Sequence, residues 1–236
     1  MLFLLPPSET KSSGGGALSI DQVALTFGGL NQAREAALEA LGDRTLLTAP
    51  TMRALDRYTG TLYSALHGRG LKGSPTANNT LTPDEIKRAK STVLIQSALF
   101  GLIPSTDLIP EYKVSPTKNL NGLNLKKLWS EAHLAIWPRL TGGLIIDLRS
   151  KAYAELAPIP DNIEHFTATV EVEYEDGSRA ALNHFNKKAK GQLVRSALTA
   201  KQPPETLADL KRCARRAGLK IEVSGSQLTI VTREAT

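Results

Sequence analysis

The chain begins with the stretch Met1-Leu2-Phe3-Leu4-Leu5-Pro6-Pro7. Its five apolar residues have the length and continuity of a buried strand, and the two prolines end that strand because proline cannot donate a hydrogen bond to a sheet. The run has no basic flank, and it is too short for a signal peptide or a membrane span. We therefore expect a protein that starts with a buried strand, does not enter a membrane and stays in the cytoplasm.

The rest of the chain mixes strand and helix patterns. Further strands are expected at residues 93–95, 143–148 and 163–174, with a hairpin partner for the last at 180–185 and a terminal hairpin at 219–223 and 227–232. Helices are expected at 31–41, 51–65, from Thr82 onward, and at 124–137, 187–200 and 204–217. Because strict βαβ alternation is missing, we predict a mixed α/β (α+β) fold with one mixed sheet flanked by helices. Residues 68–80 are expected to be the longest loop, and no linker interrupts the pattern after it, so residues 1–236 are taken as a single domain.

Positive charge is concentrated near the C-terminus. The formal net charge is +6, but the segment 187–220 contains ten Lys and Arg against two acids, so the remainder of the chain is slightly negative. Such a concentration is typical of a surface that meets an anionic partner. The single cysteine, Cys213, excludes an intrachain disulfide and a cysteine-based zinc site, and its place in a helical pattern predicts a small core residue.

The most informative part of this basic region is the segment Asn186-Lys187-Lys188-Ala189-Lys190-Gly191, followed by Arg195. It stands where an expected strand gives way to an expected helix. Lysines in the first turn of a helix oppose the positive end of the helix dipole unless an anion is present. The pattern therefore favours anion or phosphate binding, with a plain exposed face as the alternative. A second basic set, at residues 211–216, has either a dipole-stabilising or a nucleic-acid-binding role.

Polar groups elsewhere are less specific. Ser8-Glu9-Thr10-Lys11 follows the first strand, and the carboxyl ends of buried strands are where α/β sheets place their sites. Residues 56–60 form a compact polar group, and residues 100–107 could form a hairpin between helices that faces a phosphate. Glu171, Glu173 and Glu175 are interpreted as a solvated strand edge rather than an iron site. The four scattered histidines and the missing nucleotide-binding loops give no reason to expect a metal or a cofactor.

Several segments, taken in order, carry a family resemblance. They are Leu2-Phe3-Leu4-Leu5-Pro6-Pro7-Ser8-Glu9-Thr10-Lys11, Asp56-Arg57-Tyr58-Thr59-Gly60, Ser97-Ala98-Leu99-Phe100-Gly101-Leu102-Ile103-Pro104 with Asp107 and Tyr112, Leu128-Trp129, Ile146-Asp147-Leu148-Arg149-Ser150 with Tyr153, and Phe185-Asn186-Lys187-Lys188-Ala189-Lys190-Gly191. Together they resemble the YaaA family of bacterial peroxide-stress proteins. The resemblance implies a cytosolic protein of mixed α/β fold with a positively charged cleft. It also implies DNA binding and a role in limiting oxidative damage, associated with lower free iron.

Two functional hypotheses follow. In the one that we favour, a non-enzymatic protein binds DNA phosphates without sequence preference. The cations expected to do so are Lys11, Lys187, Lys188, Lys190 and Arg195, in a cleft with Ser8, Thr59, Gly60, Tyr112 and Gly191. The alternative is an enzyme that acts on a small anionic substrate such as a nucleotide or nucleobase. Its candidate catalytic residues are Glu9, Lys11, Asp56, Tyr58, Asp107 and Lys188. If these side chains share a pocket too narrow for a duplex, the enzyme gains support. If they scatter and the lysines line a wide groove, DNA binding gains support.

Overall fold

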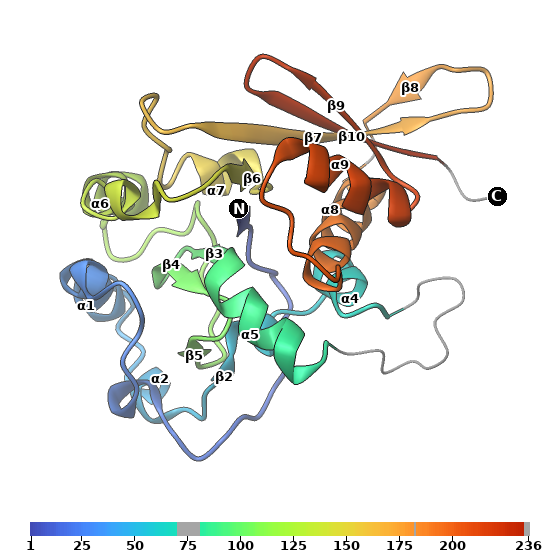
Figure 1. Cartoon of the computed structure of the whole chain (residues 1–236). Coiled ribbons are helices and arrows are strands. Elements are labelled where there is room, and N and C mark those ends of the chain that lie inside the picture. Colours follow the sequence, from blue (N-terminus) through green and yellow to red (C-terminus); the bar gives the residue numbers. More distant parts are fainter. Residues whose placement is uncertain (70–80, 182, 234–236) are drawn as a thin grey trace.

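The computed structural model describes residues 1–69, 81–181 and 183–233, and Figure 1 shows how its elements are arranged. The strands of the main sheet are β1 (Leu2–Leu5), β3 (Val93–Ser97), β4 (Gly101–Pro104), β6 (Ile145–Asp147), β7 (His165–Glu173), β8 (Arg179–Ala180), β9 (Lys220–Ser224) and β10 (Gln227–Arg233). They lie in the order β4-β3-β1-β6-β7-β10-β9, with β8 paired to β7. The sheet is mixed, as the sequence predicts.

Helices surround this sheet and a smaller two-stranded one. The α-helices are α1 (Asn31–Leu41), α2 (Thr45–Thr48), α3 (Ala54–Arg57), α4 (Thr61–Leu66), α5 (Pro83–Thr92), α6 (Leu125–His133), α7 (Lys151–Ala154), α8 (Asn183–Leu198) and α9 (Leu207–Arg216). The 3-10 turns are η1 (Ile20–Gln22), η2 (Gly28–Leu30) and η3 (Trp137–Leu140), and the small sheet pairs β2 (Met52–Arg53) with β5 (Leu108–Ile109). The long helix α8 packs against α4, α9 and β7, and so joins the N-terminal and C-terminal halves of the chain.

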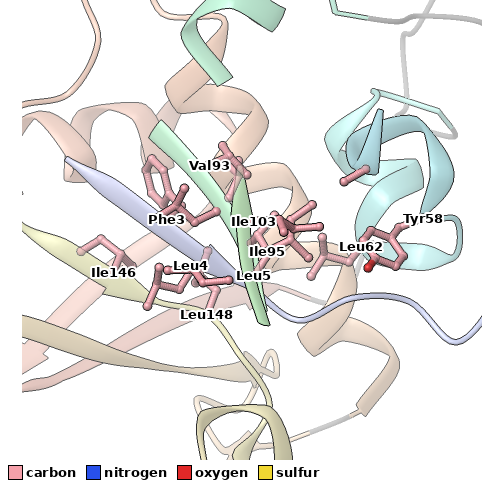
Figure 2. Close-up of a cluster of buried hydrophobic side chains, with 14 of the residues drawn as sticks. Phe3, Leu4, Leu5, Tyr58, Leu62, Val93, Ile95, Ile103, Ile146 and Leu148 are labelled. Atoms are coloured by element: carbon pink, nitrogen blue, oxygen red, sulfur yellow. The ribbon is translucent and has the colours of Figure 1, made fainter. Parts of the chain in front are cut away.

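The first strand lies inside the sheet. β1 runs parallel to β3 on one side and to β6 on the other, so that Leu4 is level with Leu94 and with Asp147. Leu4 and Leu5 are completely buried, in the cluster that Figure 2 shows. Burial on both faces of a strand requires a continuous apolar run rather than an alternating one. The expectation of a buried first strand that ends at the prolines is therefore confirmed.

Several helix ends also follow the sequence. Helix α1 ends at Gly42, which has the left-handed backbone angle (φ +70°) that favours glycine at a C-terminus. Thr82 caps α5 and Thr206 caps α9, each in a capping box with an acid three residues later. Cys213 is buried within α9, as expected of a small core residue.

The expected helix at 51–65 is wrong. The chain there forms β2, α3 and α4, with a break at Tyr58-Thr59-Gly60. Backbone pairing with the segment after β1 competes with the helix at this point, because Ser12 N donates to Arg57 O (2.8 Å) and Thr59 N donates to Thr10 O (3.1 Å). Gly60 then turns the chain with a φ of +95°. These contacts are distant in sequence, so helical periodicity alone does not reveal the break.

Three other element boundaries differ from expectation. The expected hairpin between helices at residues 100–107 is a strand turn instead, since β4 pairs antiparallel with β3 through Gly101. The helix expected at 124–137 ends at His133, and after a turn the chain forms η3, which has Pro138 in its first turn. The strand expected at 180–185 is only the two-residue β8, and α8 already begins at Asn183. Most of the loop expected at 68–80 lies outside the described residues.

Within the described parts of the chain, no helix combines the length and the apolar character needed to cross a membrane.

Candidate functional site

Lys11 lies beyond the carboxyl end of β1, in a setting built by two tyrosines. Its backbone pairs with that of Tyr58, and its Nζ donates to Ser8 O (3.1 Å) and Glu9 O (3.4 Å). The ammonium group stands 4.4 Å from the centre of the Tyr112 ring, close enough for a cation–π contact. Burial lowers the pKa of Lys11 to about 8, because the charged amine has lost part of its hydration.

A chain of hydroxyl groups runs behind this lysine. Tyr58 Oη lies 2.6 Å from Tyr112 Oη, which lies 2.7 Å from Ser97 Oγ at the end of β3. Ser97 Oγ accepts two backbone N–H groups, from Leu99 and Phe100, so its own proton is left to donate to Tyr112. Burial raises the pKa of Tyr112 to about 12 and that of Tyr58 well above its ordinary value. Both tyrosines are therefore neutral, hydrogen-bonding groups near pH 7.

The short loops beside Lys11 are joined by hydroxyl groups. Thr59 Oγ1 donates to Thr10 Oγ1 (2.9 Å), which lies 3.2 Å from Ser8 Oγ. A Cβ atom at Gly60 would come within 3.0 Å of Ser8 Oγ. Of the residues that the sequence places in a cleft, Ser8, Thr59 and Gly60 thus do lie together. The hydroxyls of the half-buried Ser8 and Thr59 and of the exposed Thr10 can donate to and accept from a polar ligand.

Two carboxylates of the enzyme hypothesis have other partners. Asp56 forms an ion pair with Arg53 (2.6 Å). Asp107 accepts hydrogen bonds from the backbone N–H of Thr26 (2.8 Å) and from Thr26 Oγ1 (2.7 Å). Burial raises the pKa of Asp107, and these hydrogen bonds and Arg34 oppose the shift. Both carboxylates therefore hold loops in place, and the structure shows no hydrogen bond or ion pair between either of them and Lys11.

The basic residues of α8 are divided among separate environments. Lys190 is 94% buried, its Nζ donates to Leu148 O (3.0 Å), and burial lowers its pKa to about 8. Arg195 donates to Leu66 O (3.1 Å) at the end of α4, and its guanidinium packs on Gly68. Lys188 instead borders a small hollow beside the end of α9 and Arg233. Lys187 and Lys190 line one pocket, but the cations that the sequence groups together do not all share it.

The observed start of α8 weakens the case for an anion next to Lys187 and Lys188. Since α8 begins at Asn183, Lys187 and Lys188 stand in its second turn rather than its first. The dipole effect fades beyond the first turn, so it gives these lysines little need for an anion. Gly191 has a packing role, because a Cβ atom there would lie 2.1 Å from Leu62 O. It allows α8 and α4 to approach closely.

A buried ion pair follows β6 and was not singled out among the candidate site residues. The guanidinium of Arg149 binds Asp147 through two parallel hydrogen bonds (2.8 and 2.7 Å), and it also donates to Ala157 O (2.8 Å). Asp147 and Arg149 are 4% and 5% exposed. Sequence reasoning could have found the pair, because an acid and a base that directly follow a buried apolar strand are bound to be partly buried with it. A bidentate pair of this kind holds the chain rigidly after β6.

This pair forms part of the wall of the largest pocket described, with a volume of about 820 Å³. The pocket lies at the carboxyl ends of β1 and β6, beside β7, and α7 and α8 complete it. In the sheet order, β3 lies next to β1 on one side, and β6, which comes later in the chain, lies next to β1 on the other side. The strand order therefore reverses between β1 and β6, which makes this a topological switch point. In α/β sheets such a switch point is where ligands bind. Residues 1–69, 81–181 and 183–233 contain no group of three or more His, Cys, Asp or Glu side chains that could hold a metal ion.

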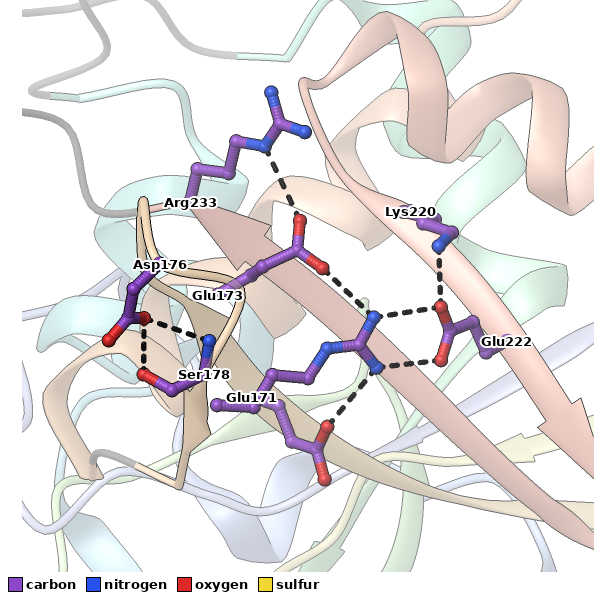
Figure 3. Close-up of polar contacts among 8 residues, drawn as sticks. Glu171, Glu173, Asp176, Ser178, Lys220, Glu222 and Arg233 are labelled. Carbon is purple, nitrogen blue, oxygen red and sulfur yellow. Dashed lines mark hydrogen bonds and ion pairs between the residues drawn. The ribbon is translucent and has the colours of Figure 1, made fainter.

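The acidic residues along β7 form a surface network. Arg179 lies among Glu171 (3.5 Å), Glu173 (3.0 Å) and Glu222 (2.8 Å). Figure 3 labels these three glutamates, together with Lys220 and Arg233, which pair with Glu222 and Glu173. Hydrogen bonds from Arg179 and Lys220 lower the pKa of Glu222 to about 2. These carboxylates are already neutralised by basic side chains, which agrees with their interpretation as a solvated edge.

The fold and the site together define an α/β protein with a charged pocket at a sheet switch point and a basic C-terminal region. A family model described as peroxide stress protein YaaA matches residues 1–224. The chain belongs to this family, which confirms the resemblance carried by its segments.

Individual relatives support this placement. The chain is 34% identical to a UPF0246 protein of Corynebacterium efficiens, over 98% of this chain and 99% of the relative. It is also 34% identical to a UPF0246 protein of Streptomyces coelicolor, over 94% and 92% of the two chains. A UPF0246 protein of Shewanella putrefaciens is 28% identical over about half of each chain.

Proposed function

We propose that this protein takes part in the response to peroxide stress and binds duplex DNA through its phosphates, without reading the sequence. The family gives the physiological class. The DNA proposal rests mainly on one observation, the gathering of exposed basic side chains from α8, α9 and β10. Lys188 and Arg233 border the same hollow as Ala217, which directly follows Arg215 and Arg216 of α9. Arg216 itself borders a neighbouring hollow with Asp209 and Arg212, and Arg233 also pairs with Glu173 (3.5 Å). We group Lys188, Arg215, Arg216 and Arg233 in the proposal as one surface, which we call the basic face.

The proposal uses fewer of the expected cations than the sequence suggested. Lys190 and Arg195 donate to backbone carbonyls. Lys11 lies beyond the end of β1, beside the rings of Tyr58 and Tyr112. Arg215 and Arg216 are exposed, whereas the neighbouring Arg212 is paired with Asp209. Lysine and arginine side chains on an exposed helix can follow a phosphate backbone without base contacts. Such binding is dominated by the release of counterions.

Only some of the candidate catalytic residues of the enzyme hypothesis lie together in the structure. Lys11 and Tyr58 are in contact, and Tyr112 joins them, but Asp56, Asp107 and Lys188 are engaged elsewhere. A lysine with a pKa near 8 can act as a base, and the carboxylates of Glu111 and Glu9 act on it electrostatically without a hydrogen bond to it. We therefore keep the enzyme as the alternative to DNA binding.

The experiment is a fluorescence-anisotropy titration of a labelled, random-sequence duplex at two salt concentrations. The triple variant Lys188→Gln/Arg215→Gln/Arg216→Gln removes part of the basic face. If each residue neutralises one phosphate, the slope of log affinity against log salt becomes shallower by about 0.9 for each phosphate that the variant no longer neutralises. A matched control, Arg44→Gln/Lys87→Gln/Lys118→Gln, makes the same change in net charge at exposed sites outside the basic face. Salt-independent binding, or an equal loss in the control, would contradict the proposal.

A further inference from the structure

We infer that the pocket at the switch point between β1 and β6 binds a phosphate monoester with a small organic body, and that Lys187 and Lys190 bind its phosphate group. This site is separate from the basic face. Its volume of about 820 Å³ is in the range of small-molecule sites, and it is far too small for a duplex. We refer to it below as the switch-point pocket.

The charges in the pocket wall identify the ligand as an anion. Arg149 and Lys151 already have acidic partners, since Arg149 binds both oxygens of Asp147 and Lys151 reaches Glu155 (4.0 Å). Lys187 and Lys190 make no ion pair with any acid among the described residues. The wall therefore carries four Lys and Arg side chains against the two acids Asp147 and Glu155, a formal excess of two positive charges.

The burial of Lys190 adds to this argument. Its side chain is 94% buried, and the one acceptor recorded for its three-proton ammonium group is Leu148 O. A buried charge is strongly unfavourable unless it is paired and hydrogen-bonded. Asp147 attracts the ammonium group of Lys190 but forms no ion pair with it. An anion in the pocket would complete its hydrogen bonding.

The number of charges favours a phosphate over a carboxylate. A phosphate monoester carries about −1.5 to −2 charges near pH 7, which matches two unpaired lysines, whereas a carboxylate would neutralise only one. Lysine binds phosphate as a compact point charge and needs no bidentate geometry. The arginine that could bind a carboxylate in that geometry is occupied by Asp147.

The remaining wall fits the organic part of the ligand. Pro6, Leu62, Pro158 and Ile159 give it an apolar surface, and His165 and Thr167 add polar groups from β7. Small-molecule sites commonly combine an apolar wall with a few polar groups that fix the orientation of the ligand. Leu62 comes from α4, which Gly191 holds against α8, so the same helix contact positions the apolar wall and the two lysines.

The test uses phenyl phosphate as the probe, with inorganic phosphate and benzoate for comparison, in isothermal titration calorimetry of the full chain. We expect saturable binding of phenyl phosphate at millimolar or lower concentration, and weaker binding of both other compounds. No saturable binding of phenyl phosphate would overturn the proposal. Tighter binding of benzoate would overturn the phosphate assignment, and equal binding of inorganic phosphate would overturn the role of the apolar wall.

Two adjacent lysines give a matched pair of variants. Lys187→Gln should weaken phenyl phosphate binding roughly 10- to 100-fold, the usual effect of losing a hydrogen bond to a charged group. Lys188→Gln makes the same change one residue away, outside the pocket, and should leave the affinity unchanged. Equal effects of the two variants would overturn the proposal. Lys190→Met should also abolish most binding, and if that variant does not fold, the comparison of Lys187 with Lys188 still decides the matter.

The two proposals fail separately. Lys188→Gln should reduce DNA affinity without changing phenyl phosphate binding, so a protein that binds the duplex but not the ester would refute only the switch-point pocket. A protein that binds the ester in a Lys187-dependent way but not the duplex would refute only the DNA proposal.

Discussion

The contact between α4 and α8 can be tested by replacing Gly191 with alanine. The added Cβ would lie 2.1 Å from Leu62 O and 2.9 Å from Ala65 Cβ, well inside normal contact distances. The helices would have to separate, and overpacking of this kind costs about 1–3 kcal/mol and occasionally more. Alanine also favours a helix over glycine by about 1 kcal/mol, which partly offsets the clash. Because the clash at 2.1 Å is with a backbone oxygen, we take its cost at the upper end of this range, about 3 kcal/mol, and expect a net loss of about 2 kcal/mol in the free energy of unfolding.

The assay is urea denaturation followed by circular dichroism, where such a loss lowers the midpoint by about 1 M. Gly142→Ala is the control, because no heavy atom lies within 4 Å of a Cβ atom placed there. It should change stability by less than about 0.5 kcal/mol. If Gly191→Ala unfolds at the same urea concentration as the unaltered protein, or a higher one, the close helix contact is refuted.

Other predictions concern buried polar groups. Asp147→Asn leaves the buried Arg149 without its carboxylate and should destabilise the protein by about 3–5 kcal/mol in the same assay; a loss below 1 kcal/mol would show that the pair is not buried as described. His133 is buried, and burial lowers its pKa to about 4. In the unfolded chain this histidine takes up a proton near pH 6.5, so the free energy of unfolding should fall as the pH drops from about 6.5 to about 4. The loss should be at most about 3 kcal/mol, and the variant His133→Gln should lack this part of the pH dependence. Tyr112→Phe removes the hydroxyl that joins Tyr58 to Ser97 and should cost about 1–3 kcal/mol in thermal or urea unfolding, whereas an unchanged stability would argue against the hydroxyl chain.

The sequence predicts the elements whose causes are local. The apolar run at Leu2–Leu5, the capping residue Thr82 and the terminating Gly42 all act on neighbouring residues, and each element follows from them. The break at Tyr58 was not predictable in the same way. It depends on backbone hydrogen bonds to residues near Thr10, which are close only after the chain has folded.

The arrangement of the candidate site is also only partly predictable from local sequence. The sequence identifies the lysines of α8 but not the difference between them. With the helix placed, residues three apart share a face, which puts Lys187 and Lys190 together and turns Lys188 away. The place of Asp147 and Arg149 at the end of a buried strand indicates their burial, but their bidentate hydrogen bonds are visible only in the structure. Sheet order was also needed, since the pocket exists where the chain changes direction between β1 and β6.

The most direct test of the switch-point pocket is a crystal structure of the protein with phenyl phosphate bound. We predict that the phosphate oxygens lie within hydrogen-bond distance of Lys187 Nζ and Lys190 Nζ, with the phenyl ring against Leu62 and Ile159. Phenyl phosphate bound only at the basic face around Lys188 and Arg216, with an empty switch-point pocket, would contradict this assignment.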